Sequence, residues 1–149
     1  MGQIGLSGRT EFPHLHLSLR QNGQVIDPFS PSDTTTCGNP TPSLWSPALP
    51  FQPGGVIDAG FATTIPSFDL MKKGGAGVET LPQTAPAMVL WAHLFGTHAG
   101  DRLTFSLNGP KDEVLRETVT LDKTQARNMR AIGKRNRGQN WLPAPIKSR

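Results

Sequence analysis

Apolar residues recur at every second position in several stretches of this chain. Leu15, Leu17 and Leu19 alternate with polar residues, and residues 102–107 repeat the pattern. Side chains of a β-strand point to opposite faces in turn, so this spacing predicts strands with one apolar face. Residues 87–95 form the most hydrophobic run, and the glycines that follow favour a buried strand there. A chain rich in strands is therefore expected.

Turn-forming residues separate the apolar runs. The 16 glycines and 14 prolines make about a fifth of the 149 residues, a high share that stays below the roughly 25–30% of low-complexity sequence. Asn22-Gly23 precedes the short apolar pair Val25-Ile26, and both turn residues tolerate positive φ. Asp27-Pro28 then stops the second strand. The pattern predicts a strand, a tight turn and a second short strand.

Composition divides the chain into three segments. Residues 1–30 carry the predicted hairpin, and residues 31–85, rich in Pro, Gly, Ser and Thr, are predicted to be a linker. Within that linker, residues 55–61 predict one short strand. Residues 86–149 form the third segment, which ends in a basic tail.

The third segment is expected to be partly β-sandwich-like. Three predicted strands, at residues 87–95, 102–107 and 114–121, are joined by short turns. Residues 123–132 are compatible with either a helix or one more strand. The fold class predicted for the whole chain is mainly β.

Charge is distributed unevenly along the chain. Up to Asp122 there are seven Lys or Arg against eleven Asp or Glu, whereas from Lys123 onward there are eight cations and no acid. A basic end attracts nucleic acid, anionic lipid or an anionic wall polymer, but it is also typical of a solvated tail. In a nucleic-acid complex Trp141 would stack on a base and five cations would contact phosphates: Arg127, Arg130, Lys134, Arg135 and Arg137. Nothing else in the sequence supports nucleic acid, which is the least favoured partner.

Membrane and disulfide classes receive no support. No apolar run approaches the roughly 20 residues that a membrane span needs. The N-terminus also lacks the basic and apolar regions of a signal peptide. The single cysteine, Cys37, excludes an internal disulfide framework and is expected to be free or paired outside this chain.

Pro13-His14-Leu15-His16 is the sharpest chemical signal. On a strand the two histidines share one face, with α-carbons about 6.6 Å apart. One imidazole can then bind a metal ion while the other contacts a metal-bound water or a substrate carbonyl. The simpler alternative is a surface strand that carries two histidines, because an H-x-H pair alone is weak evidence.

The residues around this pair strengthen the signal. A glycine-rich turn at residues 5–8 leads to Pro13-His14-Leu15-His16, then to Asn22-Gly23 and to Val25-Ile26-Asp27-Pro28. This order closely resembles the end of the lysostaphin-type (LytM-like) zinc metallopeptidase domain, in which a P-H-L-H strand precedes a turn around N-G and a V-D-P sequence. The resemblance covers residues 1–30 and implies the terminal strands of an antiparallel-sheet peptidase domain.

The resemblance implies a role for individual residues. His16 would be a zinc ligand, His14 the catalytic histidine beside it, Gly8 the residue that shapes the turn, and Asp27-Pro28 the close of the domain. The family uses zinc to cut peptide bonds of peptidoglycan, so peptidoglycan is the expected partner and the parent protein is expected in the periplasm or outside the cell. Thr10-Glu11-Phe12 replaces the small residues common in the family and is expected to alter the substrate groove.

The resemblance is incomplete in its metal ligands. The family's other zinc ligands are a His and an Asp in an H-x-x-x-D motif that precedes the P-H-L-H strand, and a further catalytic histidine lies between. The 13 residues before His14 contain neither His nor Asp, and catalytic zinc uses three protein ligands. We therefore expect part of a peptidoglycan endopeptidase that binds zinc weakly or not at all and is inactive alone. His93 and His98 lie on the wrong side of the motif and are expected to be structural.

The missing ligands lead to two further expectations. The alternative function is a non-catalytic cell-wall-binding or regulatory module, because some lysostaphin-type domains that have lost their ligands act as scaffolds or activators. The strand that carries His14 would also lack its neighbours and present an open sheet edge, which favours self-association.

Overall fold

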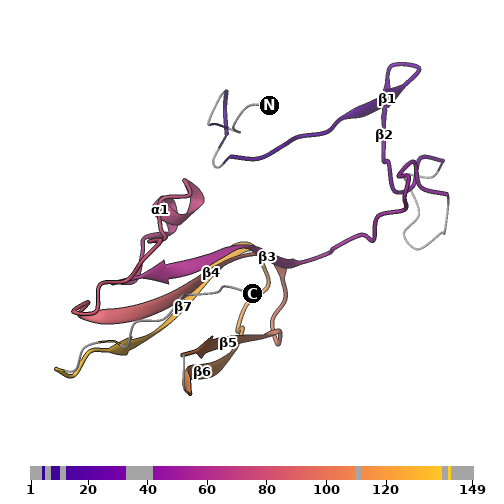
Figure 1. Ribbon diagram of the computed structural model, residues 1–149. Helices are drawn as coiled ribbons and strands as arrows, with labels where there is room; N and C mark the ends of the chain where they lie inside the picture. The colour runs from indigo at the N-terminus through magenta and orange to yellow at the C-terminus, as the bar shows by residue number, and fades with distance from the viewer. Residues whose placement is uncertain are drawn as a thin grey trace. The chain divides into compact units, whose positions relative to one another are not determined.

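The computed structural model describes residues 5, 8–10, 13–32, 42–109, 112–138 and 141 (Figure 1). Cys37 lies outside these residues. The chain divides into two compact units, Met1–Pro53 and Gly54–Arg149. Strands dominate the described residues and their pairings are antiparallel, so the mainly β prediction is confirmed.

The first unit contains a short hairpin around Asn22-Gly23. β1 (Leu19–Gln21) pairs with β2 (Gln24–Ile26). The φ values of Asn22 and Gly23 are 51° and 80°, as a two-residue turn that matches the strand twist requires. The predicted turn is confirmed, but the first strand is shorter than its alternating pattern indicated. Residues 13–18 run as an extended segment in Figure 1, and in the described part of the chain no strand pairs with them.

The loop after β2 contains a small aromatic cluster. Asp27 Oδ1 accepts a hydrogen bond from the Phe29 backbone N–H at 2.8 Å, a local turn that ends the strand. The Phe29 ring packs against Trp45 and Phe51, with ring centroids 5.6 and 5.8 Å apart. The loop is thus held by side-chain contacts that its Pro- and Ser-rich composition did not reveal.

The second unit is built around a three-stranded antiparallel sheet in the order β3-β4-β7 (Figure 1). β4 (Ala87–Thr97) lies between β3 (Gly55–Ala62) and β7 (Gln125–Arg135). Residues 89–94 of β4 are all buried, which explains why the strand is a continuous apolar run and does not alternate. β7 resolves the ambiguous segment at 123–132 as a strand.

One face of this sheet packs against a second hairpin. β5 (Arg102–Asn108) and β6 (Glu113–Thr120) pair with each other. Even-numbered side chains of β4 and the inner side of the hairpin form one core, which comprises Leu90, Ala92, Leu94, Phe105, Leu107, Leu121 and Ile132. The alternation over 102–107 therefore marks one buried face, as predicted. The wider sandwich-like arrangement stays a prediction.

The opposite face carries a second core beside a short helix. α1 (Phe68–Lys72) begins after Ser67, whose Oγ accepts a hydrogen bond from the Leu70 N–H at 3.2 Å. Odd-numbered side chains of β4 join this core, which comprises Ala62, Met71, Ala76, Val89 and Trp91. No helix of the described residues is long and apolar enough to cross a membrane.

Residues 54–85 belong to this unit, although their composition indicated a linker. β3 is a full sheet strand, Ala76 is 5% exposed, and the Val78 N–H donates to Phe61 O at 2.9 Å. A Cβ at Gly60 would come within 2.8 Å of the Trp91 ring, so glycine is what allows the indole to lie against β3. Because alanine and glycine make part of this packing, the sequence of residues 54–85 shows little hydrophobic patterning.

Candidate functional site

His14 and His16 lie on the extended segment that leads into β1. Both are exposed, and Thr10 Oγ1 lies 3.2 Å from Nδ1 of His14. Thr10 is the first residue of Thr10-Glu11-Phe12, which differs from the small residues common in the lysostaphin-type pattern. One residue of this difference therefore contacts the histidine that is predicted to be catalytic. Side chains on both sides of the segment are open to solvent, which leaves the pair accessible to a substrate, a metal ion or another strand.

A complete zinc centre needs more ligands than this segment provides. Among the residues that the structure describes, no three His, Cys, Asp or Glu side chains form a group that could hold a metal ion. His16 offers one imidazole, whereas a catalytic zinc uses three protein ligands. The described residues do not fit a zinc site by themselves, and the assignment of His16 as a ligand stays a prediction.

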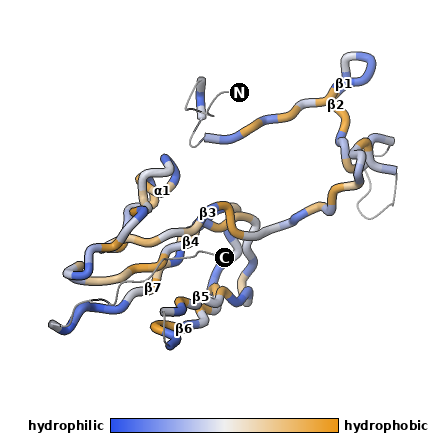
Figure 2. Tube along the Cα trace, in the orientation of Figure 1, coloured by the Kyte–Doolittle hydropathy of each residue, from blue (hydrophilic) through white to orange (hydrophobic). Residues whose placement is uncertain are grey.

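Residues 13–18 have the chemical character of a strand without a neighbour. Leu15 is 83% exposed and Leu17 is 56% exposed, although both alternate with polar residues as in a half-buried strand. Figure 2 shows apolar positions along this extended segment. A strand added beside it would cover apolar side chains and pair backbone groups at the same time.

The other two histidines have local structural surroundings. His93 is 3% exposed on β4, and its ring meets the Phe68 ring edge-on at a centroid distance of 5.8 Å. Burial lowers the pKa of His93, and the nearby charge of Arg127 lowers it further, against a smaller opposing effect of Asp58. His98 lies in the exposed turn after β4, where its backbone N–H donates to Asp101 Oδ2 at 2.8 Å. Both positions agree with structural roles.

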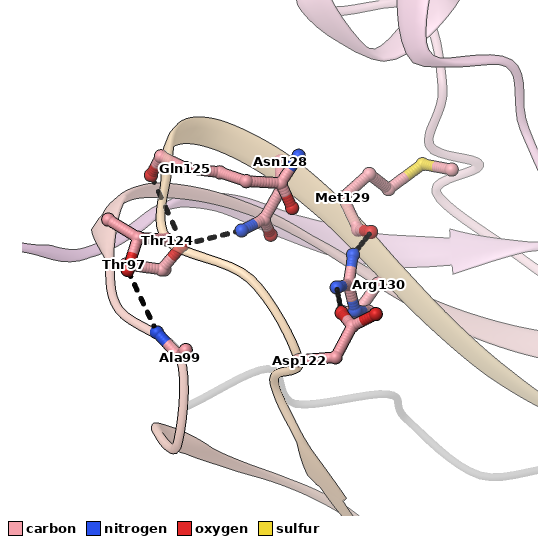
Figure 3. A network of polar contacts seen from close by, with 8 residues as sticks. All are labelled: Thr97, Ala99, Asp122, Thr124, Gln125, Asn128, Met129 and Arg130. Atoms are coloured by element: carbon pink, nitrogen blue, oxygen red, sulfur yellow. Dashed lines mark hydrogen bonds and ion pairs between the residues drawn. The ribbon is translucent and has the colours of Figure 1, made fainter.

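A buried polar network was missed by the sequence analysis (Figure 3). Asn128, on β7, donates from Nδ2 to Thr97 Oγ1 at 2.6 Å, and that hydroxyl donates to Gln125 O at 3.2 Å. The Ala99 N–H donates to Thr124 Oγ1 at 3.1 Å beside it. These contacts join the end of β4 to the start of β7 and add to the backbone pairing of the two strands.

Trp141 is tied to the second unit by two hydrogen bonds. Its Nε1 donates to Ala85 O at 2.9 Å, and its backbone N–H donates to Gln83 O at 2.9 Å. The indole is half-buried. These contacts fix the position of the side chain, and its predicted stacking on a base stays a prediction.

No family model matches the chain, and neither a curated protein nor a solved structure does. The family assignment therefore depends on the motif around His14 and His16 alone.

Proposed function

We propose that the chain is part of a zinc-dependent peptidoglycan endopeptidase of the lysostaphin type. In this proposal residues 1–30 supply the last strands of the peptidase domain, with His16 as a zinc ligand and His14 as the catalytic histidine. The observation that carries the proposal is the order of Pro13-His14-Leu15-His16, Asn22-Gly23 and Asp27-Pro28 in the sequence. The remaining ligands would come from a segment outside residues 1–149, and we expect no peptidase activity from these residues alone.

Two properties of the first unit support this assignment. The turn at Asn22-Gly23 is a tight hairpin, as the family pattern requires of the residues after the histidine strand. The histidine segment itself is exposed and has no strand partner in the described residues. A segment of this kind suits a strand that completes a larger sheet.

A graft experiment tests the proposal directly. Residues 1–30 would replace the matching segment of an active lysostaphin-type domain, and the hybrid would be tested for zinc content and for peptidoglycan hydrolysis. We expect the hybrid to bind zinc and to cleave. His16→Ala should remove both zinc binding and cleavage. His14→Ala should remove cleavage and retain zinc, because of these two histidines only His16 is proposed as a zinc ligand.

The controls of this experiment separate failure to fold from failure of the idea. Circular dichroism would establish that the hybrid folds, and Gln24→Ala, which truncates another exposed side chain within residues 1–30 of the hybrid, would serve as the control for zinc content and cleavage. A folded hybrid that binds no zinc would contradict the proposal. So would an active hybrid whose zinc content and cleavage do not depend on His16.

The alternative function is a non-catalytic cell-wall-binding or regulatory module. It is favoured by one observation, that the described residues lack a three-ligand metal group. Co-sedimentation with insoluble peptidoglycan would test it. In this alternative, binding is retained by the double variant His14→Ala/His16→Ala, because recognition does not use the histidines.

A further inference from the structure

The three-stranded sheet of the second unit has two outer strands. β3 and β7 each pair with β4, and among the described residues neither pairs with a further strand. The outer edge of such a strand is a template for another strand, including one from a second copy of the chain. β3 also carries exposed apolar side chains, with Val56 54% exposed and Ile57 44% exposed. Both edges would therefore favour strand addition unless local features oppose it.

The backbone groups on the outer edge of β3 follow from one contact. The Val78 N–H donates to Phe61 O at 2.9 Å, so the backbone groups of Phe61 point away from β4. In an antiparallel pair the backbone groups of successive residues point alternately toward the partner strand and away from it. The register of β3 and β4 is unbroken from Asp58 to Ala62. The N–H of Ala59, two residues before Phe61, therefore also points to the outer edge.

Asp58 occupies that outward N–H. Its Oδ1 accepts a hydrogen bond from the Ala59 N–H at 2.8 Å, and its side chain is exposed. A strand added along β3 would displace the carboxylate from this N–H and remove water from its charge, and both steps cost free energy. The register also shifts between Val56 and Asp58, and a bulge of this kind disrupts the ladder that an added strand would follow.

Arg130 has the corresponding position on the outer edge of β7. Because Ala92 lies opposite Ala59, its backbone groups point away from β3 and toward Arg130 on β7. The backbone groups of the preceding residue, Met129, then point to the outer edge. Arg130 Nη1 donates to Met129 O at 2.9 Å, and its Nη2 lies 3.4 Å from Asp122 Oδ1 (Figure 3). A side chain of the opposite charge thus covers an outward backbone group on this edge.

We propose that Asp58 and Arg130 are edge caps, which keep the sheet from pairing with the same sheet of a second copy. Each side chain hydrogen-bonds the outward backbone group of a neighbouring residue, and each carries a charge that an added strand would bury. The inference is independent of the proposed function, because it uses no residue of the first unit. Loss of either cap leaves an open strand edge, and at β3 that edge lies beside the exposed Val56 and Ile57.

The test measures self-association of cap variants by sedimentation equilibrium. The full chain carries Leu15→Lys/Leu17→Lys throughout, so that contacts of residues 13–18 do not contribute. Asp58→Ala should associate about tenfold more tightly than this parent, because a second copy no longer displaces and desolvates a carboxylate. Asp101→Ala is the matched control, since Asp101 also accepts a backbone hydrogen bond, from the His98 N–H at 2.8 Å, but in the turn after β4. It should associate no more tightly than the parent.

A second pair of variants tests the β7 edge. Arg130→Met removes the donor to Met129 O and keeps an apolar side chain of similar length, and it should also raise association about tenfold. Arg116→Met is its control, because the Arg116 guanidinium donates to the side chains of Glu113 and Ser106. Circular dichroism establishes that all four variants fold. Folded cap variants that associate no more tightly than their controls would overturn the proposal.

Hydrogen exchange locates the new contact. As concentration rises, the Ala59 amide should gain protection in Asp58→Ala and the Met129 amide should gain protection in Arg130→Met, because each then donates to a strand of the second copy. Tighter association without protection of these amides would also overturn the proposal, since the contact would then lie away from the sheet edges.

Discussion

The β1–β2 hairpin and the β5–β6 hairpin are both antiparallel strand pairs, but among the described residues of its own unit only the second packs against a sheet. β1 and β2 are three residues each, and Leu17 just before them is mostly exposed. β5 and β6 are seven and eight residues long. Phe105 and Leu107, on the inner side of β5, are buried against β4.

This difference shows what limits the length over which two strands pair. Both hairpins begin from a sequence that alternates apolar and polar residues, and an isolated two-stranded hairpin is at best marginally stable in water. Pairing in the first hairpin stops at Leu19 because the apolar side chains before it have nothing to cover them in the described residues. In the second hairpin, burial of Phe105 and Leu107 stabilises each added residue pair.

The largest effect that tests this comparison is loss of a buried ring. Phe105→Ala should lower the free energy of unfolding of the second unit by about 3–5 kcal/mol, because it removes an aromatic side chain and leaves a cavity. Leu17→Ala, an exposed apolar truncation beside the first hairpin, should change the free energy of opening of that hairpin by less than about 0.5 kcal/mol. Hydrogen exchange measures the first effect at the β4 amides and the second at the amides of β1 and β2. Equal losses would mean that the two hairpins are supported alike.

Self-association is the next expected difference. If the leucines before β1 lack a neighbouring strand, the chain should associate through them, and Leu15→Lys/Leu17→Lys should weaken association about tenfold or more by placing like charges at the contact. Leu44→Lys/Leu49→Lys adds the same charges at exposed positions outside the segment and is the matched control. Sedimentation equilibrium would distinguish them, and a monomeric parent chain at high concentration would refute the idea.

Acid should destabilise the second unit through His93. Its pKa in the folded chain is lowered from 6.5, first by burial, so the unfolded chain takes up a proton before the folded chain does. The contribution of neutral His93 is complete above about pH 6.5 and is lost as pH falls toward the folded-state pKa, by at most about 1.4 kcal/mol per pH unit. His93→Gln should flatten this dependence in denaturant unfolding. NMR titration of the His93 ring in the parent chain is the second measurement, and a pKa above 6.5 would contradict the sign.

The sequence predicted local features better than distant ones. The Asn22-Gly23 turn was predictable because both residues have the required backbone freedom. β7 remained ambiguous because its apolar residues, Met129, Ala131 and Ile132, pack on both faces of a strand and follow no single period. Asn128 gave no signal, since its burial depends on Thr97, which is 31 residues away in the chain.

In the candidate site, too, local features were predictable from the sequence and contacts between distant residues were not. The sequence supplied the histidine pair and its motif, and the exposure of both side chains agrees with a segment that acts on an external partner. It did not supply the anchoring of Trp141 to Ala85, because that contact joins residues 56 positions apart. A side chain that composition placed in a solvated tail is thereby part of the second unit.

The smallest expected effect is the loss of a single indole hydrogen bond, tested by making the same substitution once in each unit. Trp141→Phe removes the indole N–H that donates to Ala85 O, and should lower the free energy of unfolding of the second unit by about 1 kcal/mol. Trp45→Phe makes the same chemical change in the first unit, where Nε1 has no hydrogen-bond partner among the described residues, and should leave the second unit unchanged. Hydrogen exchange of the β4 amides reports the difference. If both substitutions destabilised β4 equally, the stability of the second unit would depend on the loop around Trp45. That result would contradict the idea that only the β5–β6 hairpin is stabilised by the sheet.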